Sequence, residues 1–334
     1  MRYVVGIDGG GTKTTAAVVG EDYQLAASAT SGPSNRRSVG MESASANIAE
    51  AVTEALQKVG LPLGELAGVC MCLAGFDTDL DLSVPQRTLR ILQYSGPAIF
   101  ENDVVGAWAG ATAVGPGIVA IAGTGATALG MNERGEFWRT DGWDTLLGDQ
   151  GSGYALGLAA IRIVMRMLDG RIAPSPLVNA LGQAFSVHSA EDMRRLVDST
   201  PFGKYEVASF ARYVSETAQA GDPLARDLLR QAGEALAENV AAIVRILGMA
   251  GEEFPISTVG SVIRDDPWVT RPFETAVKVI APHATLRAPL HPPEMGAALL
   301  CFERLAADDL GSWTLGSGKR SIRRSMRIDD LPLP

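Results

Sequence analysis

Cysteine, positive charge and long apolar runs are all scarce in this sequence of 334 residues. Its three cysteines are odd in number and form no C-x-x-C pair, which argues against a disulfide framework and indicates a reduced, cytoplasmic setting. The net charge of −9 argues against a nucleic-acid partner, because phosphate binding requires a basic face. No apolar stretch reaches transmembrane length, and Asp8 interrupts the only early one, so we expect neither membrane association nor a signal peptide.

Length and composition suggest how the chain is organised. With 334 residues the chain exceeds one ordinary domain, so two domains are expected. The apolar share of 46% and the charged share of 20% are those of a soluble globular protein.

The stretch from Tyr3 to Val19 indicates a strand, a glycine turn and a second strand. Between the two apolar runs stand a carboxylate, three glycines, a hydroxyl and an ammonium: Asp8, Gly9, Gly10, Gly11, Thr12 and Lys13. Glycine N–H groups beside a hydroxyl and an ammonium are typical of a phosphate nest. An upstream aspartate can hold hydrated Mg²⁺. The stretch therefore predicts a nucleotide-phosphate hairpin.

Two familiar glycine loops do not fit these residues. A dinucleotide fingerprint needs glycines that open a helix, whereas Thr14, Thr15 and the valines after them favour a strand. A Walker A loop needs Gly-Lys-Ser/Thr, whereas Lys13 follows a threonine. A hairpin without a ligand is the alternative, but two glycines would suffice for it.

A second acidic position follows a predicted strand at 98–100. Asp103 stands where this strand turns into a helix, and ligands of open α/β sheets bind outside the carboxyl ends of the strands. Asp103 can cap the helix, or it can act as a general base that the positive helix end keeps ionised. Asn35, in a turn-rich loop, is either a turn residue or an amide that faces a hydroxyl-rich ligand.

Residues 117–129 repeat the opening stretch. Ile121-Ala122-Gly123-Thr124-Gly125 matches Ile7–Gly11 as a strand end and glycine turn, and strand-like residues follow both. The chain therefore reads as two similar halves whose glycine turns face one polyphosphate across a cleft. Because Ala122 stands where the first copy has Asp8, only the first half would position a metal.

The remaining pattern alternates strands and helices before becoming mostly helical. Strands are expected at 24–29, 66–73, 256–258 and 284–286, and helices at 41–59, 85–94, 104–113, 154–168, 177–185, 190–197, 205–218, 223–247 and 293–305. Cys70 and Cys72 lie in the strand at 66–73 and are interpreted as core residues.

These motifs resemble the N-acetylglucosamine kinase family, which belongs with the BadF/BadG/BcrA/BcrD-type ATPases in the superfamily of sugar kinases, actin and heat-shock chaperones. The segments that carry the resemblance are DGGGTKT at 8–14, END at 101–103, IAGTGAT at 121–127, GW at 142–143, GDQGSG at 148–153 and VGSV at 259–262. The resemblance runs from about Arg2 to about Arg304.

The resemblance implies an α/β chain of two ribonuclease H-like domains, the duplicated actin-like ATPase fold, with the active site in the cleft between them. The domains would be residues 1–114 and 115–305, and a helix at 293–305 would pack back toward the first. Inserted helices in the second half resemble the family's substrate lid and dimer surface, which implies a homodimer. Residues 306–334, rich in glycine, serine and charge, are expected to be a disordered tail.

The resemblance also assigns roles to individual residues. ATP and Mg²⁺ would be the cofactors, with Asp8 on the metal and Asp103 as the base for the 6-hydroxyl of the sugar. The residues that would contact ATP are Gly9, Gly10, Gly11, Thr12, Lys13, Gly123, Thr124, Gly125 and Gly260. Those that would contact the sugar are Asn35, Gly75, Asp103, Trp143, Asp144 and Asp149.

The sequence departs from the family pattern in the sugar-facing segment. Family members usually carry Gly at the position of Asp144 and Glu at that of Gln150, and some carry Ser at that of Ala74. A carboxylate at Asp144 would attract a free amino group and so favour glucosamine. The DQGSG segment also resembles the glucosamine-kinase branch.

The resulting hypothesis is an ATP-dependent kinase that phosphorylates the 6-hydroxyl of N-acetylglucosamine. Glucosamine kinase and broad hexokinase are the alternatives within the class. An ATPase activator of a CoA-ester dehydratase or reductase is an alternative of another class, but it would need accessible cysteines for a shared iron–sulfur cluster. A sugar sensor without catalysis would be expected to lack Asp103 or to carry a DNA-binding helix pair.

Overall fold

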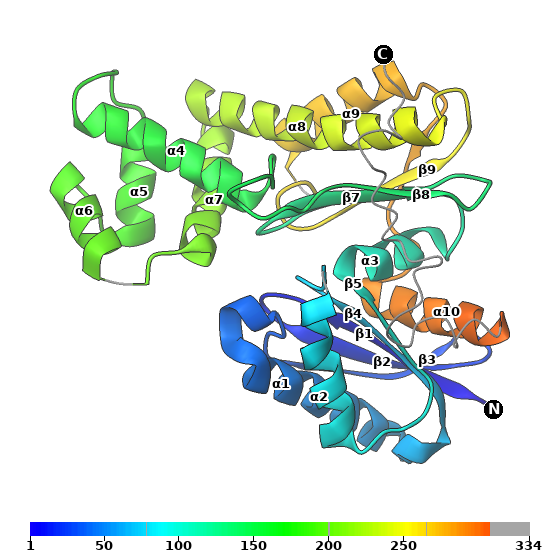
Figure 1. Ribbon diagram of the computed structural model, residues 1–334. Coiled ribbons are helices and arrows are strands. Elements are labelled where there is room, and N and C mark those ends of the chain that lie inside the picture. The colour runs from blue at the N-terminus through cyan, green and yellow to red at the C-terminus, as the bar shows by residue number, and fades with distance from the viewer. Residues whose placement is uncertain (78, 200, 265, 308–334) are drawn as a thin grey trace. The chain divides into compact units, whose positions relative to one another are not determined.

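A computed structural model describes residues 1–307 apart from 78, 200 and 265 (Figure 1). The described chain divides into two compact units, one made of residues 1–117 with 288–307 and the other of residues 118–287. Each unit contains one five-stranded sheet with helices packed on it. In the described part of the chain, no helix combines the length and apolar character that a membrane crossing needs.

The first unit contains a sheet with strand order β3-β2-β1-β4-β5. Strands β1 (Tyr3–Gly9), β2 (Thr14–Gly20) and β3 (Leu25–Ser31) form an antiparallel meander. Strands β4 (Leu66–Leu73) and β5 (Ala98–Asn102) continue the sheet in parallel with β1. Its helices are α1 (Arg36–Val59), α2 (Ser83–Leu92), α3 (Asp103–Thr112) and α10 (Pro293–Ala306), with short 3-10 helices at Leu63–Glu65 and Asp79–Leu82.

The second unit contains a sheet with strand order β10-β9-β6-β7-β8. Its strands are β6 (Gly117–Ala122), β7 (Ala126–Met131), β8 (Phe137–Asp141), β9 (Pro255–Val259) and β10 (Thr285–Leu286). Its helices are α4 (Gly153–Leu168), α5 (Leu177–Phe185), α6 (Ala190–Ser199), α7 (Lys204–Gln219), α8 (Pro223–Leu247) and α9 (Pro267–Ile280).

The two sheets have the same topology. Read from the other edge, the second sheet is β8-β7-β6-β9-β10, which corresponds strand for strand to β3-β2-β1-β4-β5. The outer pair on one side is antiparallel in both sheets, β2 with β3 and β7 with β8, and two parallel strands complete the other side. The duplication expected from the repeated glycine turns is confirmed, and with it the mixed α/β fold class.

In the first unit, glycines allow α10 to approach the sheet and α3 closely. A Cβ at Gly6 of β1 would collide with the backbone of Glu294 and Ala298 in α10. A Cβ at Gly296 would collide with the backbone of Gly106 and Gly110 in α3. Helices α1 and α2 pack on the opposite face of this sheet (Figure 1). These close contacts hold α3, and with it Asp103, against the ends of β1 and β4.

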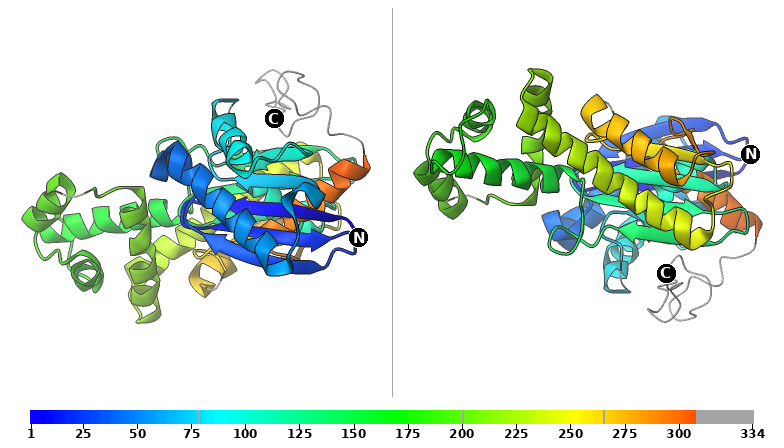
Figure 2. Two further views of the ribbon diagram at one scale, coloured as in Figure 1. Left: turned by 90° about the horizontal axis from the view of Figure 1, so that it is seen from below. Right: turned by 90° about the horizontal axis from the view of Figure 1, so that it is seen from above.

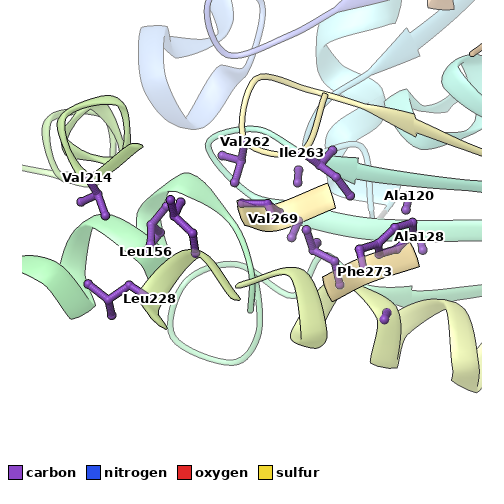
Figure 3. Packing of buried hydrophobic residues seen from close by; sticks show 14 of the residues in the cluster. Ala120, Ala128, Leu156, Val214, Leu228, Val262, Ile263, Val269 and Phe273 are labelled. Carbon is purple, nitrogen blue, oxygen red and sulfur yellow. The ribbon is translucent and has the colours of Figure 1, made fainter. Parts of the chain in front are cut away.

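The helices of the second unit extend well beyond its sheet, as the green segments in Figure 2 show. Buried residues from α4, α7, α8 and α9 nevertheless join the sheet in one core. Figure 3 shows this core: Leu156, Val214 and Leu228 come from helices α4, α7 and α8, and Ala120 and Ala128 come from the sheet. Helix α7 is therefore fixed to the rest of the unit by apolar packing.

Several elements differ from the sequence-based expectations. Strand β8 and helix α9 were not predicted. Helix α1 begins at Arg36, before the expected Met41, but Gly40 has non-helical dihedrals with φ of +78°, so the regular helix starts where expected. Strand β5 extends through Asn102, whose side chain caps α3 by accepting the N–H of Val104 at 3.1 Å, so the cap is not Asp103. The expected tail at 306–334 lies almost entirely outside the described residues.

Candidate active site

Asp8 lies near the end of the central strand of the first unit. It pairs with Thr15 of antiparallel β2 and with Cys72 of parallel β4. Burial, together with the charges of Asp103 and Glu294, raises the pKa of this carboxyl to about 7, and the charge of Lys13 opposes the rise. Asp8 is thus close enough to two other carboxylates to be repelled by them, and a cation at Asp8 would relieve this repulsion.

The first glycine turn leaves donors available for an anion. The N–H of Gly10 donates to the carbonyl oxygen of Lys13 at 2.9 Å and closes the turn. Within the described residues, the N–H groups of Gly11 and Thr12 donate to no protein acceptor. The hydroxyls of Thr14 and Ser34, both buried beside this turn, also lack partners in the described chain. Such a concentration of unused donors favours a phosphate ligand.

Loops at the carboxyl ends of the strands gather around this turn. The N–H of Ser34 donates to the carbonyl of Gly10 at 3.0 Å, and that of Ala74 donates to the carbonyl of Gly9 at 2.7 Å. Asn35 caps α1 by accepting the N–H of Arg37, so its turn role is real. Its amide also faces Gly75, where a Cβ would lie 3.5 Å from Nδ2. Asn35 thus has a structural role at the start of α1, and its contact with the sugar stays a prediction.

Asp103 occupies the first turn of α3, where the helix dipole favours negative charge. One of its oxygens accepts the N–H of Val104 at 3.0 Å. The side chain is partly exposed, which a general base requires. The first unit thus brings together Asp8, the residues of the first glycine turn, Asn35, Gly75 and Asp103.

The second glycine turn is shorter and adjoins α4. The N–H of Gly123 donates to the carbonyl of Gly125 at 2.9 Å, while the N–H groups of Thr124 and Gly125 donate to none of the described residues. The carbonyl of Gly123 accepts the N–H of Gly153, the first residue of α4, at 2.8 Å. As in the first unit, two amides remain available for an anion.

Gly260 has a structural reason to be glycine. Its φ is +108°, and a Cβ there would collide with the carbonyl group of Ala122. The backbone after β9 therefore passes directly over the second glycine turn. This contact places Gly260 beside the turn, and its contact with ATP stays a prediction.

The segment after β8 forms a loop whose two ends are joined by Asp141. The Asp141 carboxylate accepts N–H groups from Gly142 at 2.8 Å, Asp149 at 2.7 Å and Gln150 at 3.2 Å, and Asn239 Nδ2 lies 3.4 Å away. Asp141 was not predicted from the sequence. The available signal was an aspartate directly before a glycine, which is typical of a turn.

Inside this loop, two carboxylates share one lysine. Asp149 is buried, and its Oδ1 accepts the N–H of Ala126 at 3.1 Å. Lys204, the first residue of α7, places Nζ 3.1 Å from Asp149 Oδ2 and 2.8 Å from Asp144 Oδ1. Lys204 was not predicted from the sequence, because its partners stand more than 50 residues away. The charge argued to attract an amino sugar at Asp144 is therefore already paired.

Trp143 is 67% exposed, so it is not a core residue. The neighbouring Leu146 and Leu147 are exposed as well. The second unit thus brings Trp143, Asp144 and Asp149 together in one loop, which the bond to Ala126 links to the second glycine turn. Among the described residues, no group of three or more His, Cys, Asp or Glu side chains is arranged to hold a metal.

Comparison with known proteins identifies the family of the chain. Residues 5–301 match the BadF/BadG/BcrA/BcrD ATPase family. The chain belongs to this family. Two curated relatives are 31% identical: the N-acetylmuramic acid/N-acetylglucosamine kinase of Clostridium acetobutylicum (90% of this chain, 98% of the relative) and the N-acetyl-D-glucosamine kinase of Dictyostelium discoideum (89% and 97%).

Another family relative, the glucosamine kinase GspK of Vibrio cholerae, is 28% identical over 82% of this chain and 90% of its own length. A solved structure from Chromobacterium violaceum with a provisional N-acetylglucosamine kinase name is 26% identical, covers 90% of this chain and 99% of its own, and superposes with a TM-score of 0.73. The resemblance drawn from the sequence motifs is confirmed at the level of the BadF/BadG/BcrA/BcrD ATPase family.

Proposed function

We propose that this protein is an ATP-dependent amino-sugar kinase that transfers the γ-phosphoryl group of ATP to the 6-hydroxyl of N-acetylglucosamine. The observation that carries the proposal is the strand-end arrangement of the first unit, where Asp103 opens α3 near Asp8 and the first glycine turn. Membership of an ATPase family supports ATP as the phosphate donor. Two relatives that are named as kinases of N-acetylated sugars support the substrate class.

In the proposed reaction, Asp103 accepts the proton of the 6-hydroxyl. The sugar oxygen forms a bond to the γ-phosphorus as the bond between that phosphorus and the β,γ-bridging oxygen breaks, and ADP leaves. Such a transfer depends on positioning and on neutralising charge, with little covalent work for the protein. The free N–H groups at Gly11, Thr12, Thr124 and Gly125 would bind phosphate oxygens.

The residues at the end of β1 fit a magnesium ion. Asp8 offers one carboxylate whose pKa of about 7 reflects burial and the nearby charges of Asp103 and Glu294. Mg²⁺ commonly takes one or two protein carboxylates and completes its shell with water and phosphate, so a cluster of three ligands is not required. When bound, the ion would neutralise charge on the phosphates.

The sugar would contact Asn35 and Gly75 of the first unit and Trp143 and Asp149 of the second. An exposed indole can cover the apolar face of a sugar ring, and the carboxylate and amide groups can accept and donate to its hydroxyls. Asp144 would contribute less than its charge suggests, because Lys204 pairs with it at 2.8 Å. This pairing favours the N-acetylated sugar over glucosamine as the preferred substrate.

Glucosamine remains the second candidate because the Vibrio cholerae relative carries that name. The activator-ATPase alternative is disfavoured, because Cys70, Cys72 and Cys301 are all buried and cannot ligate a cluster shared between subunits.

The direct test measures ADP release with ATP and Mg²⁺ in the presence of N-acetylglucosamine, glucosamine, N-acetylmuramate, N-acetylmannosamine or glucose. We expect the highest kcat/KM with N-acetylglucosamine. A higher kcat/KM with glucosamine would show that glucosamine, and not N-acetylglucosamine, is the preferred substrate. Slow ATP hydrolysis that no sugar stimulates would overturn the kinase proposal.

A further inference from the structure

Lys204 connects the start of helix α7 to the loop 142–149, which is distant from it in sequence. Its Nζ lies between Asp144 Oδ1 at 2.8 Å and Asp149 Oδ2 at 3.1 Å. The exposed fractions of the three side chains are 34% for Lys204, 44% for Asp144 and 4% for Asp149. The arrangement differs from an ordinary surface ion pair, because one of the carboxylates is nearly buried and would be costly to leave without a counter-charge.

The loop that Lys204 holds has an unusual backbone. Asp141, Asp144 and Asp149 all have positive φ, at +61°, +71° and +61°. This region costs energy for residues with a side chain, although aspartate tolerates it better than most. The carboxylate of Asp144 accepts the N–H of Thr145 at 2.7 Å and pairs with Lys204. The ion pair offsets part of the cost of this backbone conformation.

Helix α7 holds the backbone of Lys204 in a fixed position. The α4 helix passes so close to α7 that a Cβ at Gly157 would collide with the carbonyl of Val207. Phe210 and Val214 of α7 are fully buried in the core of the unit, and Figure 3 shows Val214 in this core. Burial lowers the pKa of Lys204, but the hydrogen bond to Asp144 and the charge of Asp149 outweigh it, so the pKa lies above its usual value. Lys204 is thus a protonated side chain on a firmly packed helix.

We propose that Lys204 is a positioning residue that fixes the loop 142–149 and cancels one of its two charges, so that the site discriminates against a cationic sugar. The proposal rests on the proposed function, in which Asp149 and Trp143 contact the sugar. Without Lys204, both carboxylates would lose their ion pair with its ammonium, and the loop would carry one more negative charge near the sugar, which would attract a protonated amine. Lys204 would therefore set the preference for an N-acetyl group over a free amine.

The kinetic test compares K204M, K204R, D144G and the double variant K204M/D144G with the wild type. Methionine keeps the length and apolar stem of lysine but removes its charge. The control is K58M, which removes an exposed lysine that pairs with Glu54 in α1 of the first unit. KM and kcat are measured for ATP, N-acetylglucosamine and glucosamine.

We expect K204M to raise KM for N-acetylglucosamine about tenfold while KM for ATP changes by less than about twofold, within the usual range for contacting pairs. The ratio of kcat/KM for glucosamine to that for N-acetylglucosamine should rise at least severalfold, and K204R should restore most of the wild-type ratio. The effects of K204M and D144G should not add, because they share one ion pair. Values like those of K58M, an unchanged ratio or additive effects would overturn the proposal.

A second readout needs no activity. Leu146 and Leu147 are exposed in the clamped loop, so chymotrypsin cleavage there reports how firmly the loop is held. K204M should be cleaved at this loop at least several times faster than the wild type and K58M. If no sugar is phosphorylated, the proposed function fails while this comparison still tests the clamp; equal cleavage rates would show that Lys204 does not fix the loop.

Discussion

Asp149 Oδ1 accepts the backbone N–H of Ala126 at 3.1 Å, so a carboxylate of the loop after β8 is bonded to the first residue after the second glycine turn. A Cβ at Gly125 would lie 2.9 Å from the other oxygen of Asp149, which shows how closely the two segments approach. The proposed sugar-binding loop and a proposed phosphate-binding turn therefore share one side chain.

This shared side chain predicts different effects for two substitutions at Asp149. D149N keeps an acceptor for Ala126 but loses the ion pair with Lys204, so KM for the sugar should rise about tenfold or more while KM for ATP changes little. D149A removes both interactions and should raise both KM values. Steady-state kinetics of the two variants check this, and an unchanged KM for ATP in D149A would argue against the link to the turn.

Replacing Asp103 by asparagine should remove the proposed base and leave the fold intact, because the amide is nearly isosteric. We expect kcat to fall by roughly 10²–10⁴, the usual contribution of a general base. Sugar affinity, measured by calorimetry, should change little, and the thermal midpoint should stay close to that of the wild type. Wild-type turnover by D103N would show that Asp103 is not the base.

Asp8 should make stability depend on pH in the metal-free protein. Its pKa rises from 3.8 to about 7 on folding, so between about pH 4 and pH 7 the folded state binds more protons than the unfolded state. Stability is therefore expected to fall as pH rises through this window, by on the order of 4 kcal/mol at most.

D8N, which stays neutral, provides the comparison. With a chelator present, D8N should melt at a higher temperature than the wild type at pH 8 and at nearly the same temperature at pH 4. Added Mg²⁺ should raise the wild-type midpoint at pH 8 and leave D8N unaffected. If the wild type and D8N show parallel pH profiles and the same response to Mg²⁺, neither the shifted titration nor the metal role holds.

Gly260 and Gly135 offer a matched pair of glycine substitutions. Both have positive φ, at +108° and +72°, but a Cβ at Gly135 meets nothing within 4 Å, whereas one at Gly260 collides with Ala122. G135A should cost roughly 1–2 kcal/mol from its backbone conformation alone. G260A should cost clearly more, because the strand end and the glycine turn must separate. Chemical denaturation measures both, and equal losses would contradict the packing described for Gly260.

Local sequence patterns predicted most of the fold, because typical residues mark the ends of most helices and strands. Gly60 ends α1 in the left-handed conformation, and Pro223 and Gly248 bound α8, as such residues usually do. Helix α9 was missed although Asp266 caps it and Pro267 follows, because a second proline, Pro272, falls inside the helix. Strand β8 was missed because its five residues, FWRTD, are all only partly buried and show no clear alternation.

The site residues that lie in short contiguous motifs could be predicted from the sequence. The glycine turns and Asp103 stand at strand ends that the sequence itself indicates. The pairing of Asp144 with Lys204 could not be predicted from the sequence, because the packing of α7 on α4 brings Lys204 to Asp144. The role of Asp8 depends on Glu294, which α10 brings back to β1 from the other end of the chain. Charge balance at a site depends on the fold, and single motifs do not reveal it.

Transfer of phosphate to the 6-hydroxyl of an amino sugar is best tested by identifying the product. The reaction with ATP, Mg²⁺ and N-acetylglucosamine would be followed by proton–phosphorus correlation NMR. We expect one new phosphomonoester whose phosphorus couples to the two protons on carbon 6. Coupling to the anomeric proton, or inorganic phosphate as the only new phosphorus species besides ADP, would contradict it.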